Sequence, residues 1–396
     1  MPTAKYILPV IVFSQFCCTS LWFAGNAVMP DLLRNFNAAP STLGDLTSAV
    51  QLGFISGTLL FAIFNVADRF SPSKVFFTCA ILGALVNAGI MSQYNSVESL
   101  LLLRFLTGFA LAGIYPVGMK IAADYYEKGL GKSLGYLVGA LVLGTAFPHL
   151  LKMFATIAAL PWKLVIFGTS TLALTGGILI LLFIPDGPYR KAGLKKDFSA
   201  VPVIFRNIKF RAAAFGYFGH MWELYAFWAF VPFILQSYAA LHPGINFNIP
   251  LLSFLIIGSG GLACIAGGYI SAKFSSKKTA ATALFISGCC CLLSPLLLIQ
   301  DSANMLIIFL IIWGLTVVAD SPLFSSLVAG NAPAENRGTA LTIVNCIGFA
   351  ITIVSIQLLS YFSGIISSEY LFLMLALGPI LGLLALFKKS KNDQIS

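Results

Sequence analysis

Charged residues are scarce in this chain of 396 residues, because Asp, Glu, Lys and Arg together make up only 10% of it. Soluble domains carry roughly a quarter of their residues as charged side chains. A water-soluble globule of this length could not cover its surface with so few, which excludes a soluble enzyme and a disordered chain. The net charge of +10 would suit a nucleic-acid-binding protein, but a hydrophobic share of 58% argues against nucleic acid as a partner.

The sequence also lacks the motifs of catalysis and of metal or nucleotide binding. It has neither a complete phosphate-binding loop (Gly-x-x-x-x-Gly-Lys-Ser/Thr) nor a His-Glu-x-x-His zinc motif, and its three histidines are far apart. All eight cysteines lie in apolar stretches, where a free cysteine behaves as a small hydrophobic residue. We therefore expect no enzymatic activity, no cofactor and no metal.

What the sequence has in abundance is long apolar stretches. A helix that crosses a membrane needs about 20 mainly apolar residues. The stretches are continuous rather than alternating, which favours helices over the strands of a β-barrel. We predict an all-α membrane protein with twelve transmembrane helices, the first of them uncleaved. These helices are expected at 6–29, 44–66, 75–93, 99–122, 133–152, 163–184, 212–236, 250–272, 279–299, 305–330, 339–362 and 370–387.

Lysine and arginine are distributed unevenly between the loops. If the amino terminus is cytoplasmic, 19 of the 24 lie in cytoplasmic loops and tails. Cytoplasmic loops of membrane proteins are enriched in these two residues. We therefore expect both termini in the cytoplasm, and the positive net charge then reflects topology.

The two halves of the chain repeat each other at an offset of about 205 residues. The segment 68–74 after the second span matches 272–278 after the eighth, and Tyr115-Pro116 matches Ser321-Pro322. Paired bends of this kind suit a carrier whose two bundles rock about a site near the midplane. We predict an N-terminal six-helix bundle at 1–184, a basic cytoplasmic linker at 185–211, a C-terminal six-helix bundle at 212–387 and a cytoplasmic tail at 388–396.

The segment 65–74 resembles the loop 2–3 signature of the major facilitator superfamily. It keeps the Asp68-Arg69 core, with Asn65 and Ser71 where the family has glycine. The resemblance covers essentially the whole chain and implies the family's fold of two pseudo-symmetric six-helix bundles. In that family, charges at the cytoplasmic helix ends hold the outward-facing state and separate on inward opening. It thus implies a gating role for Asp68, Arg69, Lys74 and Asp124.

Other stretches are similar to a bacterial subgroup of this family that is loosely labelled nitrate/nitrite-like. They are 20–32, 219–232 and 317–329. This similarity implies a transporter of the bacterial inner membrane. Nitrate carriers of the superfamily use an arginine in the second span and another in the eighth, and both spans lack arginine here. Nitrate is therefore not the expected substrate.

Ionisable residues at membrane depth are costly, so each is a functional candidate. Glu223 lies about 11 residues into the seventh span, and His220 shares its helical face. Asp320 precedes Pro322 in the tenth span. Arg104 lies in a segment that resembles the family's fourth-span signature, whose arginine is associated with proton coupling. We assign Glu223 and Asp320 as protonatable carboxylates, tuned by Arg104 and His220. The alternatives are interhelical hydrogen bonds, a helix cap and, for Arg104, an interfacial position.

A polar stripe runs along the otherwise apolar first span. Lipid would reject such a face, so it should line a cavity or, alternatively, pack against a helix. The aromatic cluster of Trp222, Tyr225, Phe227 and Trp228 in the seventh span is interpreted as mainly lipid-facing. The residues expected in the substrate cavity are those of the stripe and of the bent and polar spans: Gln15, Thr19, Trp22, Asn26, Tyr115, Trp313 and Asn345.

These observations lead us to expect a proton-coupled secondary transporter that moves a small solute by alternating access. Its partners would be the solute, protons and the lipid bilayer, and we expect a monomer. One alternative is a proton antiporter that exports amphipathic or drug-like compounds. A more distant alternative is a membrane receptor, built on a carrier fold, that does not transport.

Overall fold

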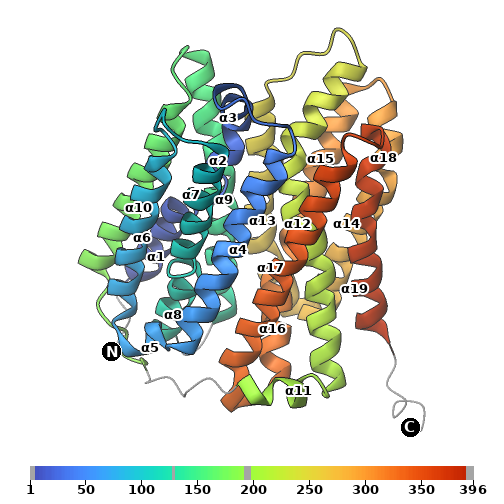
Figure 1. The fold of residues 1–396 in the computed structure, drawn as a ribbon. Coiled ribbons are helices and arrows are strands. Elements are labelled where there is room, and N and C mark those ends of the chain that lie inside the picture. Colours follow the sequence, from blue (N-terminus) through green and yellow to red (C-terminus); the bar gives the residue numbers. More distant parts are fainter. Residues whose placement is uncertain (1–4, 127–129, 191–197, 389–396) are drawn as a thin grey trace.

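The computed structural model describes residues 5–126, 130–190 and 198–388, with the backbone alone at 130–132. Within these ranges the chain is helical and contains no β-strand (Figure 1). The predicted all-α class is confirmed. The first half contains α1 (Ile7–Thr19), α2 (Ala24–Ala27), α3 (Met29–Asn35), α4 (Thr42–Ile63), α5 (Val66–Arg69), α6 (Pro72–Gly89), α7 (Val97–Leu111), α8 (Tyr115–Tyr125), α9 (Leu130–Ile157) and α10 (Lys163–Phe183).

The second half repeats the pattern of long helices joined by short turns. It contains η1 (Phe198–Ala200), α11 (Val201–Ile204), α12 (Ile208–Leu241), α13 (Ile249–Phe274), α14 (Ser276–Ile299), α15 (Ala303–Ala319), α16 (Ser321–Asn331), η2 (Ala334–Asn336), α17 (Arg337–Phe362), α18 (Ser368–Leu371), η3 (Phe372–Ala376) and α19 (Leu377–Phe387). We call the end of the molecule that carries α5 and α11 the lower face and the end that carries α3 and α18 the upper face (Figure 1).

Eleven helical stretches among the described residues are long and apolar enough to cross a membrane. The helix α1, with α2 beyond it, supplies a shorter twelfth span. For the other eleven spans, the observed helix ends lie within five residues of the predicted ones, and the largest differences are at Ile157 and Leu241. The twelve-helix fold is therefore confirmed.

The first span differs from the prediction because it is not one continuous helix. Its helical hydrogen bonding stops at Thr19, and residues 20–23 form turns before α2 begins. Exposed backbone groups are tolerated at membrane depth only where protein satisfies them. Here the carbonyl oxygens of Leu21 and Trp22 accept hydrogen bonds from Arg104. A buried arginine thus replaces part of the missing helical hydrogen bonding.

The fourth and tenth spans are also broken, and both breaks are where the sequence predicted them. The α7 helix ends at Leu111 and α8 begins with Tyr115-Pro116, whereas α15 ends at Ala319 and α16 begins with Ser321-Pro322. Proline has no backbone N–H to donate to the preceding turn, so it fits the first turn of a new helix. The offset of 206 residues between the two prolines makes these breaks equivalent positions of the two repeats.

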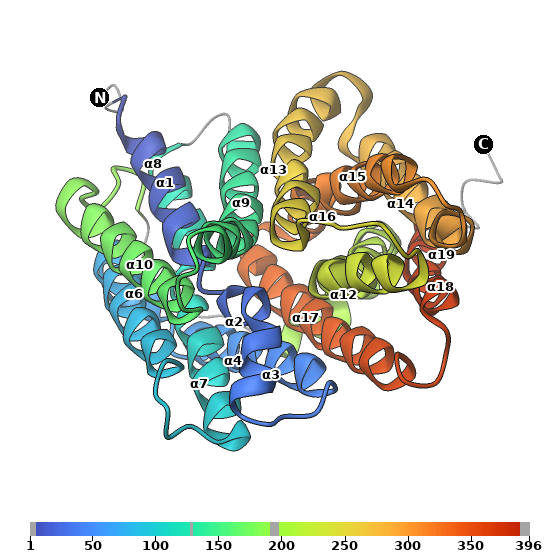
Figure 2. The same ribbon diagram turned by 90° about the horizontal axis from the view of Figure 1, so that it is seen from above.

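The helices form two bundles that meet along two helix pairs. Seen from above, α1–α10 occupy one side and α12–α19 the other, with α4 against α17 and α9 against α13 (Figure 2). The predicted bundle boundaries at 184/185 and 211/212 stay predictions. Part of the basic linker (191–197) and most of the tail (389–396) lie outside the described residues.

Candidate functional site

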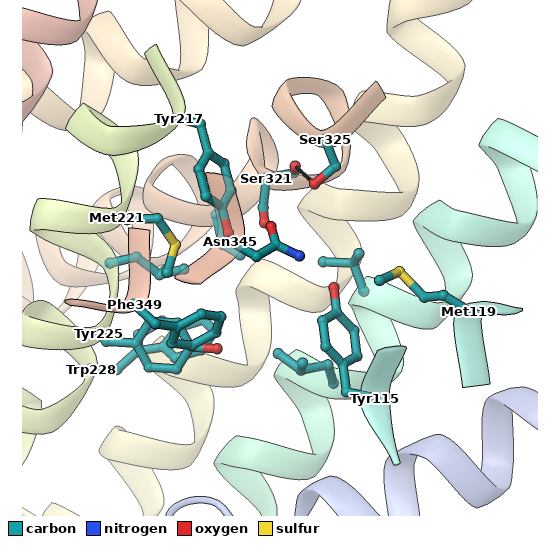
Figure 3. A pocket seen from close by; sticks show the side chains of 14 residues that line it. Tyr115, Met119, Tyr217, Met221, Tyr225, Trp228, Ser321, Ser325, Asn345 and Phe349 are labelled. Carbon is teal, nitrogen blue, oxygen red and sulfur yellow. Dashed lines mark hydrogen bonds between the residues drawn. The ribbon is translucent and has the colours of Figure 1, made fainter. Parts of the chain in front are cut away.

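A central pocket lies between the two bundles and draws residues from both. The N-terminal bundle contributes α8 and α9, and the C-terminal bundle contributes α12, α15, α16 and α17 (Figure 3). The lining residues are Tyr115, Met119, Val138, Leu141, Tyr217, Met221, Leu224, Tyr225, Trp228, Val318, Ser321, Ser325, Asn345 and Phe349. A pocket shared by both bundles changes shape whenever the bundles move relative to each other.

Several polar groups of this pocket have no partner within the described part of the chain. The phenol groups of Tyr115 and Tyr217 and the amide of Asn345 lie toward one another across the pocket (Figure 3). The indole N–H of Trp228 is fully buried and makes no hydrogen bond either. Buried polar groups are normally paired, because leaving them unpaired costs free energy. These groups are therefore available to a ligand.

The pocket is nearly closed in this state. The space open to the centres of water molecules is about 30 Å³, enough for one or two waters. Since α12 and α17 run from the lower to the upper face, Tyr225 and Phe349 lie on the upper side of the pocket, above Tyr217 and Asn345 (Figure 1). A solute would enter only after the surrounding helices had moved.

An aromatic cluster joins the two bundles on this upper side. Trp22 and Phe54 belong to the N-terminal bundle, and Tyr225 and Phe349 to the C-terminal one. Ring centroids are 5.7 Å apart for Trp22 and Phe349, 5.6 Å for Trp22 and Tyr225, and 4.5 Å for Phe54 and Phe349. Nearer the upper face, the Gln357 amide donates to Asp45 and Ser48 of α4. The molecule is thus closed toward its upper face.

A buried histidine–carboxylate pair lies directly behind the pocket wall. His220 Nδ1 is 2.8 Å from Asp320 Oδ1, and neither side chain is exposed. Asp320 occupies the break between α15 and α16, and the next residue, Ser321, lines the pocket. His220 follows the lining residue Tyr217 by three positions, with ring centroids 6.0 Å apart. A change in the charge of this pair would therefore act on the pocket wall and on the break.

Glu223 lies on α12 next to this pair but has different partners. Its carboxylate accepts hydrogen bonds from Trp313 Nε1 at 2.6 Å, Ser287 Oγ at 2.9 Å and Cys291 Sγ at 3.3 Å. The residue is 1% exposed. Although Glu223 and His220 are three residues apart on α12, their side chains turn toward different helices. Asp320 pairs with the histidine instead.

Arg104 is buried in the N-terminal bundle and contacts neither carboxylate. It donates to the carbonyl oxygens of Leu21, at 3.1 Å, and Trp22, and lies 3.5 Å from the Asn87 side-chain oxygen. The Asn87 amide in turn donates to hydroxyls of α10 at 3.0 and 3.1 Å. No ion pair involves Arg104 among the described residues. The interfacial alternative for this residue is therefore wrong, since it is only 1% exposed.

Charged residues at the lower face of the N-terminal bundle form a small network. Lys120 Nζ is 3.0 Å from Asp68 Oδ1 and 3.6 Å from Asp124 Oδ1. Arg69 and Lys74 are exposed and form no ion pair within the described residues. The structure thus brings together two of the four residues assigned to gating, through a lysine that the sequence did not single out. The sequence feature that could have identified Lys120 is its position four residues before Asp124, the spacing at which opposite charges on a helix can pair.

The family model described as Major Facilitator Superfamily matches residues 11–356. The chain belongs to the major facilitator superfamily. A human organic anion transporter, MFSD10, aligns over 98% of this chain and the whole of that one, with a TM-score of 0.74 and 14% identity, which shows the fold alone. The predicted family and fold are confirmed.

Two curated relatives are similar over part of their length. The 4-hydroxybenzoate transporter PcaK of Pseudomonas aeruginosa is 30% identical over 156 residues, which cover 39% of this chain and 32% of that protein. The high affinity nitrate transporter 2.5 of Arabidopsis thaliana is 24% identical over 228 residues, 52% of this chain and 44% of the relative. The chain therefore matches less than half the length of either.

Two of the residues that the sequence predicted for the substrate cavity, Tyr115 and Asn345, line the central pocket. Trp22 belongs to the aromatic cluster beside it, and Trp313 bonds to Glu223. The remaining stripe residues do not line this pocket. Thr19 donates to the carbonyl oxygen of Gln15, Asn26 donates to Thr47, and Gln15 packs where Gly118 leaves space. Because the helix breaks after Thr19, the stripe does not form one continuous helical face. A cavity role for Gln15, Thr19 and Asn26 stays a prediction.

Sequence reasoning missed most of the pocket side of α12. Tyr225, Phe227 and Trp228 are at most 3% exposed, so the interpretation of this aromatic cluster as lipid-facing is wrong. The Trp222 indole donates to the Met374 carbonyl oxygen. Apolar residues cover all faces of α12 because this helix packs against other helices nearly all round. The hydrophobic pattern of its sequence therefore could not distinguish the face toward the pocket from the other faces. Among the described residues, no group of three His, Cys, Asp or Glu side chains could hold a metal ion.

Proposed function

We propose that this chain is a proton-coupled secondary transporter that carries a small solute across the bacterial inner membrane by alternating access. The observation that carries the proposal is the buried His220–Asp320 pair, 2.8 Å apart behind the pocket wall and at a break in the tenth span. Ionisable groups this deep in a membrane protein are costly and are retained for function by default.

Proton binding at Asp320 couples the pocket to the movement of the bundles. Protonation neutralises the carboxylate and weakens its attraction to His220, so that α16 gains freedom to turn relative to α15. Ser321 and Ser325 of α16 line the pocket, so this movement changes the solute-binding groups. Glu223 is the second protonatable carboxylate, and its three donors stabilise the charged form until a proton arrives.

The lining of the pocket favours an uncharged or cationic solute with an aromatic or other flat apolar part. Tyrosine, tryptophan and phenylalanine rings provide apolar walls, while hydroxyl, amide and indole groups provide hydrogen bonds. No lysine or arginine is among the described lining residues. One relative is named as a transporter of 4-hydroxybenzoate, whose ring fits such walls but whose carboxylate would find no cation here.

The orientation follows from the basic residues of the lower face. We place this face in the cytoplasm, with both termini, because it carries most of the lysines and arginines. The state described is then closed toward the periplasm by the aromatic cluster. The Asp68–Lys120–Asp124 network, with Arg69 and Lys74 nearby, acts at the cytoplasmic gate. The transporter functions as a monomer, since each chain contains a complete central pocket.

Proteoliposomes with a pH-sensitive dye inside test this proposal. A panel of neutral phenols and aromatic amides, with benzoate as the anionic member, is added outside while the internal pH is recorded. Symport carries protons inward with the solute, so a transported solute acidifies the interior. We expect Asp320→Asn and Glu223→Gln to abolish this acidification. The control Asp301→Asn changes a carboxylate that is 96% exposed at the upper face and should leave it intact.

The sign of the pH change separates the alternatives. An antiporter exporting amphipathic compounds would exchange incoming solute for outgoing protons, so the interior would become alkaline. A receptor that does not transport would bind solute with no pH change. Acidification that persists in Asp320→Asn and Glu223→Gln would remove these carboxylates from the coupling mechanism.

A further inference from the structure

Among the described residues, no lysine or arginine at the lower end of the C-terminal bundle forms an ion pair. Each lysine or arginine in an ion pair among the described residues belongs to the first 190 residues. In the C-terminal bundle the described ion pairs involve only histidine. Lys278, in the first turn of α14, is exposed to the surroundings. Its positive charge is therefore free to attract an external anion.

An apolar groove leads away from Lys278 on one side of α14. It lies between α13, α14 and α15 and has a volume of about 510 Å³, within the range of roughly 300–1,000 Å³ that small ligands occupy. Small residues such as Ala263, Ala266 and Gly267 deepen it, and the exposed side chains of Ile270 and Phe274 form its rim. Its lining includes no carboxylate.

A second groove leads away from the same lysine on the other side of α14. It lies between α14 and α19, has a volume of about 510 Å³, and is lined by Phe285, Leu383 and Phe387 among others. Lys278 and Thr282 line both grooves. A second cation, Lys277, lies 5.6 Å from the centre of the Phe387 ring at the rim. Figure 2 shows α14 between α15 and α19, as this arrangement requires.

We propose that an anionic phospholipid straddles the lower end of α14, with its headgroup on Lys278 and one acyl chain in each groove. Two apolar grooves that converge on one cation match a molecule with two chains and one charged headgroup. Both grooves open on the surface of candidate membrane spans, where lipid is the available ligand. Basic pockets between membrane helices are known to favour anionic headgroups.

The matching segment of the N-terminal repeat carries an acidic residue that the segment with Lys278 lacks. Residues 68–74 and 272–278 occupy equivalent places in the two repeats. In the first, the acidic Asp68 binds Lys120, and the charges neutralise each other. In the second, Ala272 stands at the position of Asp68, so the segment that carries Lys278 contains no carboxylate.

Native mass spectrometry of the full chain in mild detergent tests the proposal. Phosphatidylglycerol and phosphatidylcholine with identical acyl chains serve as probes. We expect wild type to bind the anionic lipid more tightly, and Lys278→Gln to weaken that binding about fivefold, as for loss of one lysine near an anionic surface. Lys273→Gln is the matched control, since it removes an exposed lysine at the same end that lines neither groove.

A second variant tests the grooves independently of charge. Ala266 is exposed and lines the first groove, so Ala266→Phe fills it without disturbing the core. We expect it to weaken binding of both lipids, whereas Ala272→Phe, outside the grooves, should not. Equal binding of the two lipids by wild type would overturn the proposal. An equal effect of Lys273→Gln and Lys278→Gln, or an unchanged affinity in Ala266→Phe, would do the same.

Discussion

The two bundles share an architecture but use their buried charges differently. The N-terminal bundle buries Arg104, which bonds to backbone carbonyl groups at the break in the first span. The C-terminal bundle buries Glu223, His220 and Asp320, next to the central pocket. The two breaks that are followed by a proline recur at the same offset in the two bundles. The interruption of the helix is therefore repeated, whereas the buried titratable groups are not. This contrast supports a structural role for the buried arginine of one bundle and, in our proposal, proton coupling by the buried carboxylates of the other.

Arg104→Met should have the largest effect on stability. The variant leaves the carbonyl oxygens of Leu21 and Trp22 buried and unpaired, and each such group costs about 1–3 kcal/mol. We expect the free energy of unfolding in detergent to fall by about 2–6 kcal/mol. Circular dichroism during denaturation measures this change. Asp320→Asn keeps the size of the side chain and should keep its stability while it loses proton movement.

Two further variants sharpen this first comparison. Arg104→Lys keeps the positive charge but has one nitrogen for two carbonyl groups, so a partial loss of stability would assign the effect to hydrogen bonding. Arg34→Met removes an arginine side chain that is 76% exposed and should be neutral. If Arg104→Met were as stable as wild type, the arginine would not hold the break, and the contrast between the bundles would fail.

Glycine substitutions should instead affect both bundles equally. A Cβ atom on Gly108 would lie 2.0 Å from the Val50 carbonyl oxygen, and one on Gly314 would lie 2.1 Å from that of Ile256. These glycines are 206 residues apart and let equivalent helix pairs, α7 with α4 and α15 with α13, approach closely. Overpacking costs about 1–3 kcal/mol, so we expect Gly108→Ala and Gly314→Ala to lower the melting temperature similarly. A large effect in one bundle alone would mean that the repeats pack differently.

The fold was predictable because each feature that defines it is local in sequence. Length of apolar runs identified the spans, and the proline pairs located the breaks in the fourth and tenth spans. The break in the first span was not predictable, because residues 20–23 contain neither proline nor glycine. Arg104, about 80 residues away, supplies the hydrogen bonds that permit it. A tertiary contact of that range leaves no signal in the local sequence.

The site was predictable in its ionisable members and in two lining residues, Tyr115 and Asn345. The cost of burying charge in a membrane pointed to Glu223, Asp320 and His220, all of which are buried at the C-terminal bundle's core. The hydrogen-bond partners of Glu223 could not be predicted from the sequence, since Ser287 and Cys291 look like ordinary residues of an apolar helix. Pairing depends on how helices rotate against one another, and small-residue contacts rather than periodicity decide that rotation.

Two tyrosines that face each other across the bundles should contribute moderately and alike. Tyr115 belongs to the N-terminal bundle and Tyr217 to the C-terminal one, and both line the pocket. A hydrogen bond contributes about 0.5–1.5 kcal/mol, so Tyr115→Phe and Tyr217→Phe should each weaken solute binding by about two- to tenfold. Isothermal titration with the transported solute measures this. An effect confined to Tyr217→Phe would place the whole binding site in the C-terminal bundle.

The smallest effect is expected at the lower face, where the bundles again differ. Lys120→Gln breaks the ion pairs with Asp68 and Asp124, and its side chain is 24% exposed. Partly exposed pairs contribute about 0.2–1 kcal/mol and are screened by salt, so we expect a small loss of stability that disappears at high salt. Lys273→Gln in the C-terminal bundle, which breaks no ion pair in the described chain, should cause no such loss. If both variants lost the same stability at low salt, the paired lysine of the N-terminal bundle would contribute no more to stability than the unpaired lysine of the C-terminal bundle.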